Sequence, residues 1–138
     1  MEKLPSILLV DDDDTSNFLH QHLLDKLGVA EEVRTVPDGA QALALLTQPV
    51  SYAPTLLLLD VKMPVMSGIE FLEAYRHLPQ AQQDATVVVM LTTSMAAADL
   101  ARINELPIAG LVSKPLNRDK INTLLQLHFH RQLPRETE

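Results

Sequence analysis

The stretch ILLVDDDD, residues 7–14, joins an apolar run directly to four aspartates. Every position from Ile7 to Val10 is apolar, and such a run without alternation indicates a strand buried on both faces of a sheet. Four adjacent carboxylates repel one another, so folding them together is unfavourable unless a cation or solvent relieves the repulsion. The stretch therefore predicts a central strand that ends in a candidate site for a cation.

The rest of the chain alternates further predicted strands with predicted helices. Two more runs are apolar throughout, LLLL at 56–59 and TVVVML at 86–91, and two mixed segments at 32–36 and 109–113 are typical of edge strands. Helical patterns follow at 16–27, after Asp38, from Ser67 to Pro79, at 96–104 and after Asn117. Strict alternation of this kind predicts an α/β fold with a doubly wound, five-stranded parallel sheet in the flavodoxin-like order 2-1-3-4-5.

Composition limits the classes of function. The chain has 138 residues, of which 46% are hydrophobic and 21% charged, so we expect a single domain with a core at about 5–130 and a short polar tail at 131–138. The net charge of −7 argues against nucleic acid as a partner, and the lack of cysteine excludes disulfides and thiol chemistry. No apolar run is long enough for a bilayer and no signal peptide is evident, so we expect a cytoplasmic protein without a membrane partner.

Polar residues follow four of the five predicted strands. In parallel sheets these strand ends share one edge, where ligands bind beside the point at which the strand order reverses. The residues are Asp11 and Asp12 after the first strand, Asp60 after the third, Thr92 and Thr93 after the fourth, and Lys114 with Pro115 after the fifth. Clustered carboxylates suit Mg²⁺, a hydroxyl and a lysine suit phosphoryl oxygens, and Asp60 is placed to attack phosphorus.

Other polar residues have simpler interpretations. Asp13 and Asp14 lie where the first helix begins, where a carboxylate caps the helix and interacts favourably with its dipole. The pairs His20 with His22 and His128 with His130 are two residues apart, a spacing that does not place them on one helix face, so we expect surface histidines. Leucines at 19, 23 and 27 form the stripe expected to bury the first helix.

At this point a family becomes recognisable. The segment DVKMPVMSG, residues 60–68, resembles the D-x-x-M-P-x-M-x-G signature of response-regulator receiver domains in two-component signalling. The segments VDD, MLTTS and SKP fall in the order that this family uses, and the resemblance covers about residues 5–130. It implies a phosphoprotein without an attached output domain, since only 23 residues follow Pro115.

The resemblance also implies a role for each site residue. Asp60 would accept a phosphoryl group from a histidine kinase or a phosphotransfer protein, in a transfer and later hydrolysis that the domain itself catalyses. Asp11, Asp12, Asp60 and the backbone carbonyl of Lys62 would bind Mg²⁺. Thr92 would be the switch hydroxyl, Lys114 would pair with the phosphoryl group, and the bond from Lys114 to Pro115 would be cis.

The expected output is a change in the surface formed by the fourth helix, fifth strand and fifth helix, read by a downstream protein. The sequence departs from the family pattern at Leu111, where an aromatic switch residue is common. Lys62 and Ser94 occupy positions that tune loss of the phosphoryl group. Because Lys62 is not the amide-bearing residue of fast self-dephosphorylating members, we hypothesise a longer-lived phosphoform.

Two alternatives remain open from the residues. VDDDDT also satisfies the D-x-D-x-T pattern of haloacid-dehalogenase-like phosphatases, with Asp11 as nucleophile and Asp13 as general acid. That fold needs a further acidic pair after the lysine, where only Asp119 follows, and it leaves Asp60 unexplained. The other alternative is a pseudo-receiver that binds partners without phosphorylation, which would need none of the site residues.

Overall fold

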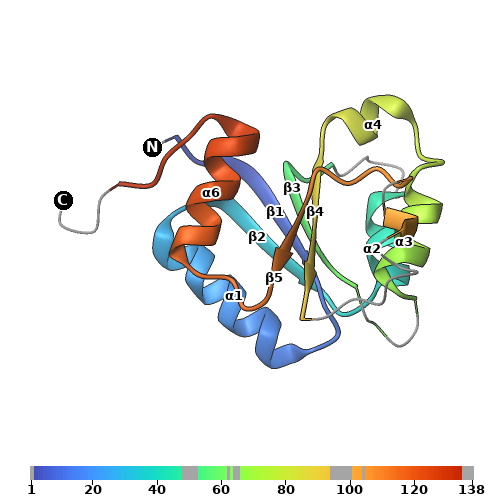
Figure 1. Cartoon of the computed structure of the whole chain (residues 1–138), viewed down its shortest axis with the longest axis horizontal. Helices are drawn as coiled ribbons and strands as arrows, with labels where there is room; N and C mark the ends of the chain where they lie inside the picture. The colour runs from blue at the N-terminus through green and yellow to red at the C-terminus, as the bar shows by residue number, and fades with distance from the viewer. Residues whose placement is uncertain are drawn as a thin grey trace.

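The computed structural model describes residues 2–47, 53–61, 63, 66–93, 101–103 and 105–134. Its centre is one sheet of parallel strands in the order β2-β1-β3-β4-β5, so the predicted fold and strand order are confirmed. The strands are β1 (Leu4–Val10), β2 (Ala30–Val36), β3 (Leu56–Asp60), β4 (Val87–Thr92) and β5 (Gly110–Ser113). Figure 1 shows the sheet between two groups of helices.

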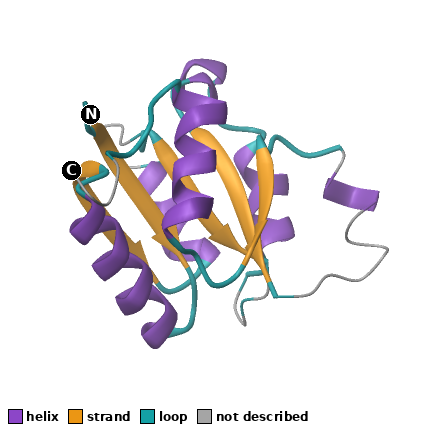
Figure 2. Cartoon of the chain, turned by 60° about the vertical axis from the view of Figure 1, so that its left-hand side comes forward, coloured by secondary structure: helices purple, strands orange, loops and turns teal. Residues whose placement is uncertain are grey.

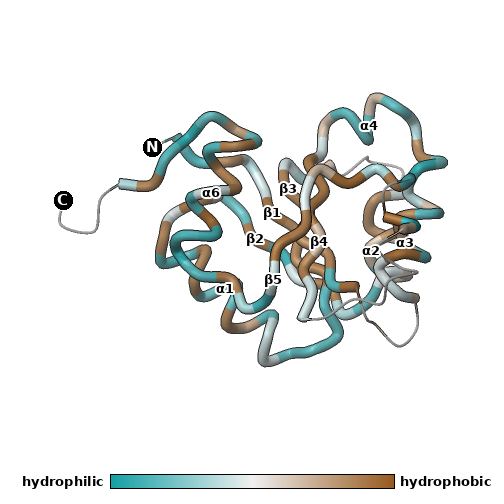
Figure 3. The backbone as a smooth tube through the Cα atoms, viewed as in Figure 1, coloured by the Kyte–Doolittle hydropathy of each residue, from teal (hydrophilic) through white to brown (hydrophobic). Residues whose placement is uncertain are grey.

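Helices cover both faces of the sheet, as right-handed crossovers between parallel strands require. The helices α1 (Asp14–Leu27) and α6 (Arg118–Phe129) lie on one face, and α2 (Gly39–Leu46) and α3 (Gly68–Tyr75) lie on the other (Figures 1 and 2). Successive residues of β1 divide accordingly: Leu8 joins the core under α2 and α3, and Leu9 joins the core under α1 and α6. The hydropathy colouring in Figure 3 shows the apolar strands between these layers.

The helix ends follow the expected capping residues. Asp38, Ser67 and Asn117 each accept a backbone N–H of the helix that they precede, and Ser67 forms a capping box with Glu70. The third helix ends at Tyr75, earlier than the predicted end at Pro79, and Pro79 instead precedes a short helix, α4 (Gln80–Asp84), that the pattern did not predict. Of the helix expected at 96–104, residues 101–103 are helical and the rest lies outside the described residues.

The buried face of α1 differs from the predicted leucine stripe. Leu19 is 56% exposed, whereas Asn17, His20 and Leu24 are the residues that α1 buries. All three lie on one face because they are three and four positions apart. Leu23 and Leu27 pack against the core as predicted, but the prediction is wrong at Leu19, because the first half of α1 packs beside the polar end of the sheet rather than over its apolar centre.

The chain after α6 turns back on that helix. Leu133, within the segment expected to be a polar tail, is 4% exposed and joins the core under α1 and α6. Its amide donates to Asn122 Oδ1 over 2.8 Å. Across the residues that the structure describes, we find no helix with the length and apolar character needed to cross a membrane.

Candidate functional site

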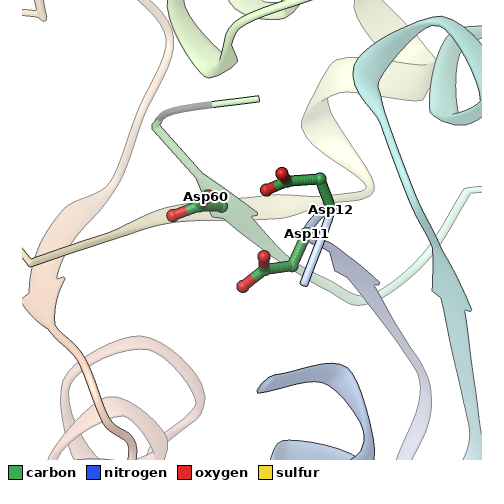
Figure 4. Close-up of side chains that lie close together, drawn as sticks. All are labelled: Asp11, Asp12 and Asp60. Carbon is green, nitrogen blue, oxygen red and sulfur yellow. The ribbon is translucent and has the colours of Figure 1, made fainter. Parts of the chain in front are cut away.

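The acidic residues gather at the carboxyl edge of the sheet, as predicted. Asp60 is the last residue of β3, and Asp11 and Asp12 directly follow β1, which pairs with β3 through Val10 and Leu59. One carboxylate oxygen from each aspartate lies within 4.8 Å of the others (Figure 4). Asp11 and Asp60 are buried and Asp12 is exposed, so the cluster is open to solvent on one side.

Lys114 enters this cluster from the loop between β5 and α6. Its Nζ lies 2.6 Å from Asp11 Oδ2 and 3.5 Å from Asp60 Oδ1. The peptide bond from Lys114 to Pro115 is cis, the geometry that the resemblance implied. One ammonium group therefore contacts two of the three carboxylates.

A cavity of about 280 Å³ opens above these groups. Its lining is polar and includes both threonines that follow β4; the residues are Asp11, Asp12, Asp13, Asp60, Val61, Thr92, Thr93 and Lys114. Thr92 thus lines the same cavity as Asp60. Every residue singled out at the strand ends, apart from Pro115, contributes to this one cavity.

Burial and charge set the protonation of the site. Burial, together with the negative charge of Asp11, raises the pKa of Asp60 to about 6, although Lys114 opposes the rise. For Lys114 burial lowers the pKa, but the hydrogen bond to Asp11 and the charges of Asp60 and Asp11 outweigh it and raise the pKa above its usual value. Lys114 is thus a cation at neutral pH, and a pKa of about 6 leaves Asp60 mostly ionised there.

The donor set fits a hard divalent cation. Mg²⁺ takes oxygen ligands and is usually held by one or two carboxylates together with water and phosphate oxygens. Asp11, Asp12 and Asp60 supply the carboxylates, and the pKa of Asp60 stays raised, chiefly by burial and then by the charge of Asp11, despite its contact with Lys114. The Lys62 carbonyl, expected as a further ligand, and Ser94 both lie outside the described residues.

Asp13 and Asp14 lie at the start of α1, as the sequence predicted. The Asp13 side chain accepts the backbone N–H groups of Thr15 and Ser16, and it is the N-cap of α1. Asp14 lies in the first turn, where a carboxylate is favourable. The Asp13 amide also donates to Asp11 Oδ1 over 2.9 Å, which links the cap to the acidic cluster.

The glycine of the segment DVKMPVMSG has a steric role at the site. Gly68 donates its amide to the Val61 carbonyl over 2.8 Å, and a Cβ at Gly68 would lie 2.4 Å from the backbone oxygen of Asp60. No side chain fits at that distance. The start of α3 can therefore approach the end of β3 only because residue 68 is glycine.

The structure also reveals two site neighbours that the sequence pattern did not identify. His20, expected at the surface, is 3% exposed, and its Nε2 accepts the backbone N–H of Leu116. Asn17 is 8% exposed and donates from Nδ2 to the Asp11 carbonyl. His22 and His130 are exposed, as expected. Because residues 17 and 20 are polar, the apolar periodicity of the sequence could not show that they lie on the buried face of α1.

Comparison with known proteins agrees with the geometry. The family model described as the response regulator receiver domain matches residues 7–126. The chain belongs to the response regulator receiver family. Members of this family are signalling proteins of two-component systems that receive phosphoryl groups from kinases and are not classical enzymes.

Among its relatives is a probable chemotaxis protein CheY of Rhizobium etli, 29% identical over 123 residues that cover 89% of this chain and 91% of the relative. A two-component response regulator from Cytophaga hutchinsonii superposes with a TM-score of 0.83 at 27% identity and covers 94% of this chain and 100% of its own. The Mn²⁺-bound form of response regulator Rcp1 superposes with a TM-score of 0.75 at 28% identity over 95% of this chain and 99% of its own.

The receiver assignment also bears on the phosphatase alternative. In that alternative Asp13 is the general acid, but its carboxylate accepts two backbone N–H groups at the start of α1. Asp60, which the alternative leaves unused, is instead buried in the cluster and contacted by Lys114. The family match and the geometry of Asp13 both give the phosphatase no support.

Proposed function

We propose that this receiver domain accepts a phosphoryl group on Asp60 from a histidine kinase or a histidine phosphotransfer protein, in a reaction that depends on Mg²⁺. The observation that carries the proposal is the contact of Lys114 with both Asp11 and Asp60 at the mouth of one polar cavity. A carboxylate nucleophile and a cation within 3.5 Å of it are two of the groups that phosphoryl transfer uses.

In the transfer an oxygen of the Asp60 carboxylate attacks phosphorus. The bond between phosphorus and the donor nitrogen breaks, its electron pair stays with the donor, and an acyl phosphate forms on Asp60. Lys114 would bind a phosphoryl oxygen from the side of β5, and the Thr92 hydroxyl, which lines the same cavity, would donate to another. Asp11, Asp12 and Asp60 would hold Mg²⁺, which when bound supplies positive charge to the phosphoryl oxygens.

The output that we infer is a change in the surface next to Lys114. This lysine directly follows β5 and precedes α6, so movement of its ammonium toward a phosphoryl group would act on both elements. Leu111 on β5 is 43% exposed and lies in the apolar groove between β5 and α6. A downstream protein that contacts this groove would then distinguish the two forms.

The proposal is tested by incubating the protein with MgCl₂ and acetyl phosphate and measuring the intact mass. We expect the wild type to gain the mass of one phosphoryl group, and Asp60→Asn to gain none. Asp25→Asn is the matched control, because Asp25 is an exposed aspartate on α1 outside the cavity, and it should label like the wild type. A wild type that remains unlabelled would contradict the proposal, and an adduct that persists in Asp60→Asn but disappears in Asp11→Asn would favour the phosphatase.

A further inference from the structure

Two polar side chains are buried on α1 and have no part in the proposed transfer. Asn17 and His20 lie one helical turn apart on the same face as Leu24. Burying polar groups in place of leucine lowers stability unless their hydrogen bonds compensate. Both residues make such bonds, and both bonds reach loops that carry site residues.

Asn17 is bonded to the loop that carries the acidic pair. Its Nδ2 donates to the Asp11 carbonyl over 2.8 Å, and the bond spans the turn between β1 and α1. Within the described part of the chain, the buried Oδ1 of the same side chain has no hydrogen-bond partner. A buried amide oxygen without a protein partner lowers stability, so Asn17 is a poor choice for packing alone.

His20 is bonded to the loop that carries the lysine. Its Nε2 accepts the N–H of Leu116 over 3.3 Å, two residues after Lys114. An acceptor at Nε2 requires the neutral imidazole with its proton on Nδ1. Burial lowers the pKa of His20, and the positive charge of Lys114 lowers it further, which keeps the ring neutral. From α6, Lys120 donates to the carbonyls of Ser113 and Pro115 in the same loop.

We propose that Asn17 and His20 are positioning residues: Asn17 fixes the backbone that presents Asp11 and Asp12, and His20 fixes the loop that presents Lys114. The expected effect of these residues on phosphoryl transfer rests on the proposed function. The 2.6 Å contact from Lys114 to Asp11 joins the two loops across the cavity. A shift of either loop would therefore change the distance between the ammonium, the carboxylates and an incoming phosphoryl group.

The two residues act on different steps, which distinguishes positioning from a structural role. Loss of the Asn17 donor frees the Asp11 backbone, so Asn17→Leu should weaken Mg²⁺ binding roughly tenfold, as second-sphere substitutions commonly do. Its labelling by acetyl phosphate should recover at saturating MgCl₂. His20→Leu should leave Mg²⁺ affinity little changed but slow labelling roughly tenfold at every MgCl₂ concentration, because Lys114 is misplaced.

Three further proteins complete the experiment. His20→Gln keeps an acceptor for the Leu116 amide and should restore most of the labelling rate. Leu24→Ala creates a cavity on the same face of α1, and the Leu24 side chain has no polar atom that could hydrogen-bond to either loop, so this variant reports the effect of lost packing. Calorimetry with MgCl₂, labelling rates from intact mass, and urea unfolding are measured for each variant. In the wild type, ¹⁵N spectra of His20 should show the proton on Nδ1.

The outcomes separate this inference from the proposed function. Rates and Mg²⁺ affinities that follow unfolding free energy alone, as in Leu24→Ala, would overturn the inference, and so would a proton on His20 Nε2. Failure of His20→Gln to exceed His20→Leu in labelling would overturn the part of the inference that concerns His20. If the wild type takes up no phosphoryl group, the proposed function fails, while calorimetry on Asn17→Leu and the His20 spectra still decide the positioning.

Discussion

Helices α1 and α3 follow the two strands, β1 and β3, whose carboxyl ends carry the site aspartates, yet they bury different chemistry. The buried face of α3 is apolar apart from the Tyr75 hydroxyl, and Phe71 and Leu72 on it are fully buried. The buried face of α1 begins with Asn17 and His20 and becomes apolar only at Leu24. Helix α3 is thus attached to the sheet by packing, and the first half of α1 by hydrogen bonds to loops.

The difference reflects how each helix meets the site. The start of α3 is fixed to β3 by the close approach of Gly68 to Asp60, so its side chains are free to fill the core. The start of α1 lies beside two loops, those of Asp11 and Lys114, whose backbone groups need partners. Substitutions in the two helices should therefore separate stability from the geometry of the site.

Phe71→Ala should have the largest effect. The ring is fully buried and stacks with Tyr75 at a centroid distance of 5.7 Å, so its removal should lower the free energy of unfolding by about 3–5 kcal/mol. Urea denaturation measures the loss. Mg²⁺ affinity of the remaining folded protein should not change, and a large change in affinity would show that α3 packing also sets the site.

Gly68→Ala should come next, with a loss of about 2 kcal/mol in the free energy of unfolding, because its Cβ would overlap the Asp60 backbone oxygen. The displacement of Asp60 should also slow labelling by acetyl phosphate. Gly39→Ala is the milder comparison on the same face, since its Cβ would meet the Met66 side chain at 3.1 Å and Phe71 Cβ at 3.2 Å, with no contact as close as the 2.4 Å at Gly68. Equal losses for the two alanines would contradict the steric role of Gly68.

Asp60→Asn should stabilise the protein in EDTA at pH 7, by about 1–2 kcal/mol in urea unfolding. The pKa of Asp60 rises from 3.8 to about 6 on folding, so the folded chain holds this proton more tightly and the ionised form lowers stability at neutral pH. The advantage of asparagine should shrink as the pH falls through 6 toward 4. An advantage independent of pH would exclude ionisation of the buried Asp60 carboxyl as its cause.

Leu19→Gln should have the smallest effect, within about 0.5 kcal/mol, because Leu19 is largely exposed. Leu24→Ala on the buried face of the same helix should cost about 2–5 kcal/mol. Thermal or urea unfolding of the pair tests which stripe of α1 faces the core. A large loss for Leu19→Gln would restore the face predicted from the leucines.

The strands and the site edge were predictable because their signals are local. Residues 56–59 are apolar at every position, and burial on both faces of the sheet is the arrangement that favours such a run. Strand order then brings Asp11, Asp60, Thr92 and Lys114 to one edge without further information. The N-caps Asp13, Asp38, Ser67 and Asn117 were equally local.

The errors arose where tertiary contacts override local pattern. The buried face of α1 could not be predicted from its residue types. Leu19 fits an apolar stripe and His20 does not, but His20 is buried because it bonds to a backbone amide 96 residues away. Helix α4 is five residues long, and Gln82 and Gln83 tie it to the carbonyls of Leu46 and Leu78. Helices that short have no stable propensity of their own.

Asp11 and Asp60 are far apart along the chain, and this separation affects how a bound cation would change the stability of the fold. The two carboxylates become neighbours only when β1 and β3 pair, so the unfolded chain lacks the three-carboxylate cluster. A cation held by the cluster would therefore bind the folded chain alone and would raise its stability by about 2.7 kcal/mol at one hundred times its dissociation constant. The concentration of that cation in solution would then affect the free energy of unfolding as well as the chemistry of Asp60.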